Sequence, residues 1–302
     1  MPTVFAAADI GSNTAHLLIA QMGTTGLQRL ANESEWLSLG QVVSHDGVIP
    51  KDLVSQLVAT LQKFKLLAST MRAEGLYVFA TEAVRKAENH KEVLRIVKRE
   101  TGLKVEIVTP RREAELGLKG ALLDRMTGGK FAFVESGGGS VQIAVCQGPD
   151  IIEEDSLPIG TGVLIDRGPL SQPAASKSVE TVRQMIGDAL SQLSEVNGVA
   201  QILASGGVAR GLWRALHPDG DPCLFREELQ YLAWSTQHLN TKTIISRYRV
   251  KGKRAVTLLP GALIYLALLD RLNVPQMVVS QFGVREGAIL ELSQGKIVPC
   301  PL

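Results

Sequence analysis

Apolar residues along the chain gather in short strand-like runs that alternate with longer segments of helical spacing. The opening MPTVFAAADIG reads as a first strand, and residues 53–71 carry apolar side chains three and four positions apart, which predicts a helix. Strands are further predicted at 76–80, 105–108, 201–204 and 277–279, and helices at 82–102, 113–123, 178–196, 261–272 and 285–294. Strands and helices alternate, so the predicted fold class is α/β.

One stretch of the sequence occurs twice. ADIGSNTAHLLIAQ at residues 8–21 matches VESGGGSVQIAVCQ at residues 134–147 with a constant offset of 126 residues, so that Asp9 falls opposite Glu135. Each copy reads as a strand, an acidic residue, a turn of small residues and a second strand, which predicts a β-hairpin. Two copies at this distance indicate a duplicated domain rather than a short-period solenoid.

The length of 302 residues also suits two domains. A GlyGlyLys sequence precedes the second hairpin, so we place the boundary there. Residues 1–120 are predicted to form the N-terminal domain and residues 121–302 the C-terminal domain. The last predicted helix is expected to pack back on the first domain.

Composition narrows the classes of partner. Lys and Arg total 32 against 30 Asp and Glu, so the net charge of +2 gives no bulk attraction to nucleic acid. The longest apolar run, residues 258–269, is too short to span a bilayer. Cys146, Cys223 and Cys300 lie far apart, which argues against a disulfide framework. We therefore expect a cytoplasmic protein with neither a nucleic-acid nor a membrane partner.

A basic run lies at residues 247–254 and contains five Lys or Arg residues. If this segment is extended, alternate side chains share one face and form a rail for a long polyanion. The other interpretation is a solvated loop, and the sequence leaves both open.

The two hairpin turns are the candidate binding sites. Small residues let backbone N–H groups converge on one point, which creates a cradle for an anion. The alternative is that the turns are structural only. The turn residues are Gly11, Ser12, Asn13 and Thr14 in the first copy and Gly137, Gly138, Gly139 and Ser140 in the second. A third small-residue turn, with Gly206 and Gly207, follows a predicted strand and opens a helix, a common place for an anion or nucleotide and equally a tight structural turn.

These segments resemble the exopolyphosphatase / guanosine pentaphosphate phosphatase (Ppx/GppA) family of the actin-like ATPase superfamily, over nearly the whole chain. Eight motifs occur in the family's order. They are ADIGSNTAHLLIA, ATEAVRKAEN, REAELGLKGAL, FVESGGGSVQIAV, SLPIGTG, ILASGGVAR, LLPGALIYLALLDRL and VSQFGVREGAIL.

The resemblance implies two actin-like (ribonuclease H-like) domains with a phosphate-binding cleft between them. It implies hydrolysis of terminal phosphate from polyphosphate or guanosine pentaphosphate with Mg²⁺ (or Mn²⁺), and a homodimer is plausible. By matched position, Glu113 activates water, Arg85 clamps phosphate, and Asp9 and Glu135 lie close to the metal. Each residue also has a plainer interpretation: a helix-start acid for Glu113, a solvated face for Arg85 and a turn-forming role for Asp9.

The chain departs from the family at these sites. Gln142, Val256 and Gln281 stand where the family usually has carboxylates, and Arg112 replaces an acid just before Glu113. Arg112 is expected to hold Glu113 ionised. A less acidic cleft would bind metal more weakly and a bare polyanion more strongly. Three hypotheses therefore stand: a metal-dependent phosphohydrolase, a phosphate-chain or nucleotide sensor without turnover, and a kinase or ATPase of the wider superfamily.

Overall fold

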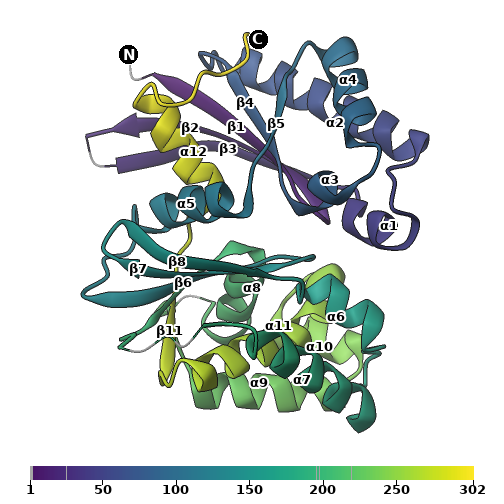
Figure 1. The fold of residues 1–302 in the computed structure, drawn as a ribbon, viewed down its shortest axis with the longest axis vertical. Coiled ribbons are helices and arrows are strands. Elements are labelled where there is room, and N and C mark those ends of the chain that lie inside the picture. The colour runs from purple at the N-terminus through teal and green to yellow at the C-terminus, as the bar shows by residue number, and fades with distance from the viewer. Residues whose placement is uncertain (1–2, 25, 195, 197, 219) are drawn as a thin grey trace. The chain divides into compact units, whose positions relative to one another are not determined.

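The computed structural model describes residues 3–24, 26–194, 196, 198–218 and 220–302. The chain divides into two compact units (Figure 1). Unit 1 contains residues 1–123 and 282–302, and unit 2 contains residues 124–281. The last helix, α12 (Val284–Ser293), thus belongs to unit 1.

Unit 1 is built on a five-stranded sheet. Its strands are β1 (Val4–Ile10), β2 (Thr14–Gly23), β3 (Gly26–Trp36), β4 (Leu76–Ala80) and β5 (Val105–Ile107), in the order β3-β2-β1-β4-β5. β1 and β2 form the first predicted hairpin, and β4 and β5 run parallel to β1. The central strands are almost continuously apolar because helices cover both faces, whereas burial along the edge strand β3 alternates.

Helices cover the two faces of this sheet. They are α1 (Leu39–Asp46), α2 (Lys51–Thr70), α3 (Glu82–Lys86), α4 (His90–Thr101), α5 (Pro110–Ala121) and α12. The helix predicted over residues 82–102 is wrong in one respect, since it is broken into α3 and α4. The chain leaves helical geometry at Ala87 (φ −66°, ψ 126°), which ends α3. The side chain of Asn89, just before α4, then bonds the N–H and the carbonyl of Ile49 at 3.0 and 2.8 Å, which holds this connection in place.

α12 packs directly on α5 (Figure 1). The two backbones approach so closely that a Cβ atom on Gly287 would lie 1.9 Å from the carbonyl oxygen of Leu116. The same helix pair carries a buried ion pair, in which Glu291 bonds Arg112 and Lys119. Glycine contact and buried charges together attach the end of the chain to unit 1.

Unit 2 is built on a six-stranded sheet. Its strands are β6 (Lys130–Ser136), β7 (Val141–Gln147), β8 (Asp150–Leu157), β9 (Ile202–Ser205), β10 (Cys223–Phe225) and β11 (Gln276–Val279), in the order β10-β11-β9-β6-β7-β8. β6 and β7 form the second predicted hairpin, and β9 and β11 run parallel to β6. The duplicated hairpins are therefore confirmed.

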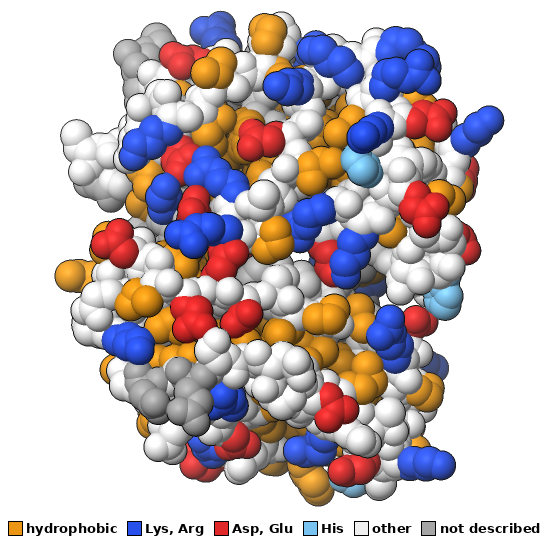
Figure 2. All heavy atoms as spheres, viewed as in Figure 1, with side chains coloured by type: hydrophobic (Ala, Val, Ile, Leu, Met, Phe, Trp, Pro, Cys, Tyr) orange, Lys and Arg blue, Asp and Glu red, His pale blue; other side chains and the backbone are white. Residues whose placement is uncertain are grey.

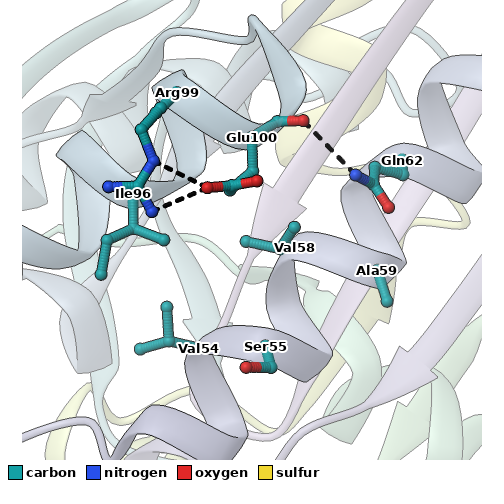
Figure 3. A pocket seen from close by; sticks show the side chains of 8 residues that line it. All are labelled: Val54, Ser55, Val58, Ala59, Gln62, Ile96, Arg99 and Glu100. Carbon is teal, nitrogen blue, oxygen red and sulfur yellow. Dashed lines mark hydrogen bonds and ion pairs between the residues drawn. The ribbon is translucent and has the colours of Figure 1, made fainter.

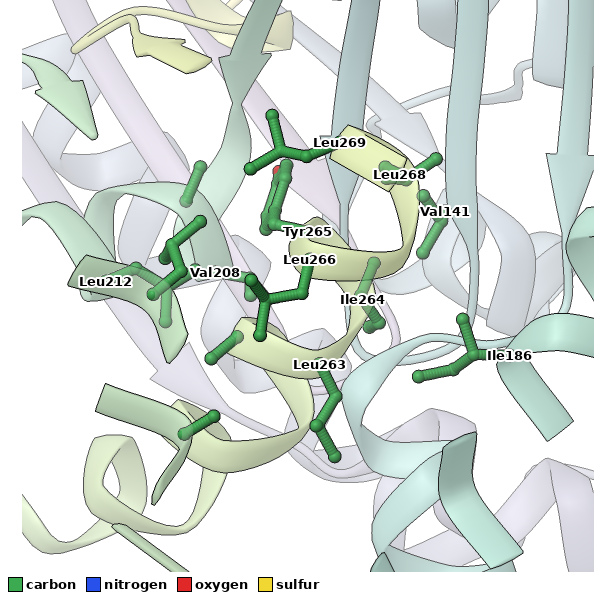
Figure 4. Packing of buried hydrophobic residues seen from close by; sticks show 14 of the residues in the cluster. Val141, Ile186, Val208, Leu212, Leu263, Ile264, Tyr265, Leu266, Leu268 and Leu269 are labelled. Atoms are coloured by element: carbon green, nitrogen blue, oxygen red, sulfur yellow. The ribbon is translucent and has the colours of Figure 1, made fainter. Parts of the chain in front are cut away.

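The helices of unit 2 are α6 (Thr161–Arg167), α7 (Ser176–Leu190), α8 (Gly206–Leu216), α9 (Arg226–His238), α10 (Thr241–Tyr248) and α11 (Gly252–Arg271). α7 ends at Leu190, before the predicted end at Val196; residues 195 and 197 lie outside the described part. α11 is the core helix, and Figure 4 shows Ile264 and Tyr265 among side chains from neighbouring elements.

The prediction for the start of α11 is wrong, and one of the two interpretations of the basic run is excluded. The helix starts at Gly252 rather than Gly261, because the chain continues in helical geometry through Pro260. The basic run is not extended, since it spans the end of α10, a left-handed residue at Arg249 (φ 50°) and the start of α11. Alternate side chains therefore do not share one face, and these five basic residues do not form an extended binding surface for a polyanion.

α11 is, by length and composition alone, able to cross a membrane. It is longer than the apolar run in the sequence, but 67% of its most apolar window is buried inside the protein. That burial favours a core helix. On the face shown in Figure 2, Lys and Arg side chains lie among Asp and Glu side chains, in keeping with the near balance of charge.

The Glu291 ion pair gives a test of how α12 is held. The side chain of Glu291 is only 3% exposed. Burial raises the pKa of this carboxyl, but hydrogen bonds from Arg112 and Lys119 outweigh burial and lower the pKa below its ordinary value of 4.5. We expect Glu291→Gln to reduce the free energy of unfolding at pH 7 by about 3 kcal/mol.

Because the folded pKa is depressed, the stabilisation is present above pH 4.5 and is lost as the pH falls through the folded pKa. Urea unfolding at pH 7 and at lower pH should show a smaller acid loss in Glu291→Gln than in wild type. The exposed Glu92→Gln should change stability by less than about 0.5 kcal/mol. Equal effects of the two variants would contradict this role of Glu291.

Candidate functional site

The predicted site residues of unit 1 lie along one edge of its sheet. The parallel strands β1, β4 and β5 end side by side, and the N–H of Thr81 donates to the carbonyl of Ile10 at 3.1 Å. The segments that follow these strands carry the turn 11–14, Arg85 in α3 and Glu113 in α5. Ligand sites of α/β sheets form at this carboxyl edge.

The first turn directs its N–H groups outward. The N–H of Gly11 donates to the carbonyl of Thr14 at 3.0 Å and closes the turn. The carbonyl of Ser12 accepts from Gly40 at 2.7 Å, and that of Asn13 accepts from two N–H groups just before α1. In a trans peptide unit, the N–H points opposite to the C=O. The N–H groups of Asn13 and Thr14 therefore face away from α1.

Arg85 and Glu113, the two predicted catalytic residues, lie together. One guanidinium nitrogen of Arg85 donates to the carbonyl of Val108 at 2.6 Å and lies 3.5 Å from Oε2 of Glu113. The hydroxyl of Thr109 accepts from the N–H of Arg112 and caps α5, which fixes the turn that carries Glu113. The two side chains are only 22% and 13% exposed. The Arg85 guanidinium that faces the carboxylate is thus held by a backbone carbonyl.

Arg112, which was expected to hold Glu113 ionised, has other carboxylates as its partners. Adjacent residues of a helix point in different directions. Arg112 instead bonds Glu291, a contact that raises the pKa of the guanidinium, and it lies 3.6 Å from Glu115. The cation beside Glu113 is Arg85.

Asp9 is also paired with an arginine. Its Oδ1 accepts from Arg285 of α12 at 3.0 Å, and both side chains are largely buried. A Cβ on Gly11 would lie 3.8 Å from Oδ2, so the other oxygen lies on the side of the turn. Arg285 was not predicted, because it is 276 residues away in sequence. The pairing offsets the negative charge of Asp9 and weakens its attraction for a cation.

The second turn has the geometry of the first. The N–H of Gly137 donates to the carbonyl of Ser140 at 2.9 Å. The carbonyls of residues 137–139 accept hydrogen bonds of 2.8–3.1 Å from the N–H groups of residues 160–162, where α6 begins. By the same peptide geometry, the N–H groups of residues 138–140 face away from α6.

The third turn lies at the start of α8. Gly206 has φ +88°, a conformation that favours glycine, and a Cβ there would lie 3.2 Å from Cγ of Glu135. Arg254 lies over this turn, 3.5 Å from the position of a Cβ on Gly207. Burial, and then the charge of Arg214, lowers the pKa of Arg254. In the sequence, Arg254 was considered only as part of the basic run. Its position just before the LLPGA motif, at the start of residues 254–262, could have indicated that it belongs to the candidate site.

The residues present do not form a complete metal site. Across the described ranges, no group of three His, Cys, Asp or Glu side chains is placed to hold a metal ion. Asp9 is paired with Arg285, and the amide nitrogen of Gln142 points at Ser140 Oγ from 2.8 Å. Mg²⁺ commonly takes one or two carboxylates together with substrate phosphates. The metal role of Asp9 and Glu135 stays a prediction.

One surface pocket lies away from these turns, between α2 and α4 (Figure 3). Its volume is about 300 Å³, and Val54, Val58 and Ile96 line it beside the ion pair of Arg99 with Glu100. None of the predicted site residues lines it.

The comparisons with known proteins agree with the resemblance seen in the sequence. The model of the Ppx/GppA phosphatase family matches residues 18–295. Exopolyphosphatase 1 of Mycobacterium tuberculosis is 28% identical over 299 residues, covering 93% of this chain and 86% of that protein. The guanosine-5'-triphosphate,3'-diphosphate pyrophosphatase of Vibrio cholerae is 23% identical and is covered over 59% of its length.

The fold is also matched by a solved structure. The crystal structure of the Aquifex aeolicus member of the Ppx/GppA family superposes with a TM-score of 0.85 at 27% identity, covering 99% of this chain and all of that one. The α/β fold class predicted from the sequence is therefore confirmed. The chain belongs to the Ppx/GppA phosphatase family.

Proposed function

We propose that the protein is a phosphohydrolase that removes the terminal phosphate from inorganic polyphosphate or from guanosine pentaphosphate. The observation that carries this proposal is the carboxyl edge of the unit 1 sheet, where the turn 11–14, Arg85 and Glu113 follow three adjacent strands. Relatives named for polyphosphate and for guanosine polyphosphate hydrolysis support the same reaction class.

The chemistry divides among these groups. The N–H groups of the turns bind phosphate oxygens, and Arg85 neutralises charge on the terminal phosphate. Glu113 accepts a proton from water as the water oxygen attacks the terminal phosphorus. The bond from phosphorus to the bridging oxygen breaks, and the electron pair leaves with the shortened chain. The products are orthophosphate and a chain one phosphate shorter.

The proposed reaction would use a divalent cation, Mg²⁺ or Mn²⁺, together with the phosphate chain. Asp9, beside the first turn in sequence, and Glu135, beside the second, are the carboxylates predicted to lie close to such a cation. When bound, such a cation would neutralise charge on the phosphate oxygens. The chain's own residues position the phosphates and the water.

A second candidate function is a phosphate-chain sensor of the same fold. The observation that favours it is Gln142, whose neutral amide occupies a position where the family usually has a carboxylate. Binding without turnover would follow if that carboxylate is indispensable.

Phosphate release tests the hydrolase directly. With Mg²⁺ or Mn²⁺, we expect wild type to release phosphate from long-chain polyphosphate or from guanosine pentaphosphate. Glu113→Gln should lower kcat by about 100-fold or more, since the general base is removed. Glu115→Gln, a change of the same type on the same helix, should retain activity. No release from either substrate would rule out the hydrolase, and full activity of Glu113→Gln would rule out its role.

The second turn provides a test of phosphate binding. A Cβ on Gly160 would lie 2.4 Å from the carbonyl carbon of Gly138, so Gly160→Ala must displace the turn. We expect affinity for tripolyphosphate to fall by about tenfold or more, measured by calorimetry, because the N–H groups lose their alignment. Gly187→Ala in α7 is the control, since nothing lies within 4 Å of its Cβ position. Equal affinities of the two variants would show that this turn does not bind the chain.

A further inference from the structure

Gln142 occupies a central position beside the second turn. It is 3% exposed and lies in β7, directly opposite Glu135 of β6 on one side and Ser156 of β8 on the other. Its side-chain amide nitrogen donates to Oγ of Ser140 at 2.8 Å and reaches Oγ of Ser156 at 3.5 Å. The side chain therefore belongs to the turn as a hydrogen-bond donor.

That contact sets the direction of the Ser140 hydroxyl. A hydroxyl has one proton and two lone pairs, and here one lone pair is filled by the Gln142 amide. The Ser140 proton is then available for another acceptor. The N–H groups of residues 138–140 already face away from α6, since the carbonyls of residues 137–139 bond the start of that helix. Turn and hydroxyl together form a donating surface, which complements phosphate oxygens.

A carboxylate at position 142 would reverse this polarity. It would accept the Ser140 proton, and the hydroxyl would turn its lone pairs outward. It would also stand opposite Glu135, at the cross-strand Cβ separation of about 4.5–5.5 Å. Two carboxylates so close cannot both stay charged at low cost without a cation or a shared proton. With a carboxylate at position 142, phosphate binding by the turn would therefore require a divalent metal. With Gln142, it does not.

In unit 1, the carboxylate beside the first turn is neutralised by an arginine. The Asp9 carboxylate is paired with Arg285 at 3.0 Å, so its charge is already offset. Resting on the function proposed above, we propose that the turn 137–140 binds a linear phosphate chain without a divalent metal, with Gln142 as the residue that makes this possible. The metal is then required for hydrolysis and not for binding.

The experiment is calorimetric titration of the intact protein with tripolyphosphate, in EDTA and in Mg²⁺. We expect the wild-type Kd in EDTA to lie within about threefold of the Kd in Mg²⁺. Gln142→Glu should weaken binding in EDTA by about tenfold or more, because a charge is added beside the phosphates, and Mg²⁺ should restore most of the loss. Gln147→Glu adds the same charge at the exposed end of β7 and should behave like wild type.

Loss of wild-type binding in EDTA would overturn the proposal, as would a Gln142→Glu protein that binds as wild type does. If circular dichroism shows that Gln142→Glu is unfolded, Ser140→Ala replaces it. Removing the hydroxyl should weaken binding in EDTA by about threefold or more, and unchanged binding would count against the proposal.

Phosphate release in Mg²⁺, measured on the same wild-type samples, separates this inference from the proposed function. Binding in EDTA without release in Mg²⁺ would leave the inference standing and reject the hydrolase. Release in Mg²⁺ without binding in EDTA would do the reverse.

Discussion

The constraint on which both candidate phosphate-binding turns depend is the use of turn carbonyls by the start of a neighbouring helix. In unit 1 the carbonyls of Ser12 and Asn13 bond the segment that opens α1, and in unit 2 those of residues 137–139 bond the segment that opens α6. Because the N–H of a trans peptide unit points opposite to its C=O, these hydrogen bonds make the turn N–H groups face away from α1 in unit 1 and from α6 in unit 2. The donors are therefore fixed by the backbone and need no reorganisation to meet an anion.

The two units share this geometry but differ in the side chains around it. Asp9 lies opposite His16 in its hairpin, as Glu135 lies opposite Gln142. In unit 1 the pair of Arg85 and Glu113 follows the strands next to the first hairpin, whereas the second turn of unit 2 has Gln142 and its serine partners. Duplication has thus preserved the backbone cradle, while the groups suited to proton transfer belong to unit 1.

Much of the fold was predictable because its signals are local. The hairpins, their glycine turns and most strands follow from alternation and small residues close together in sequence, and the resemblance brought Arg85 and Glu113 into one hypothesis. The contacts that were missed involve distant partners. Glu291, which binds Arg112, is 179 residues away, and Arg285, which binds Asp9, is 276 residues away. The periodicity of the sequence carries no information about such pairs. The start of α11 was missed for a different reason: a proline normally ends or kinks a helix, but α11 continues through Pro260.

The charge distribution limits where affinity for a polyanion can come from. A net charge of +2, with both signs interspersed on the face in Figure 2, provides no long-range attraction for a polyanion. Affinity must then come from short-range donors, and these are the turn N–H groups, the Ser140 hydroxyl and arginines such as Arg254. Each is held by backbone or packing rather than by a long flexible side chain in water. In the proposed function, donors held in this way would bind phosphate oxygens at fixed positions within each unit.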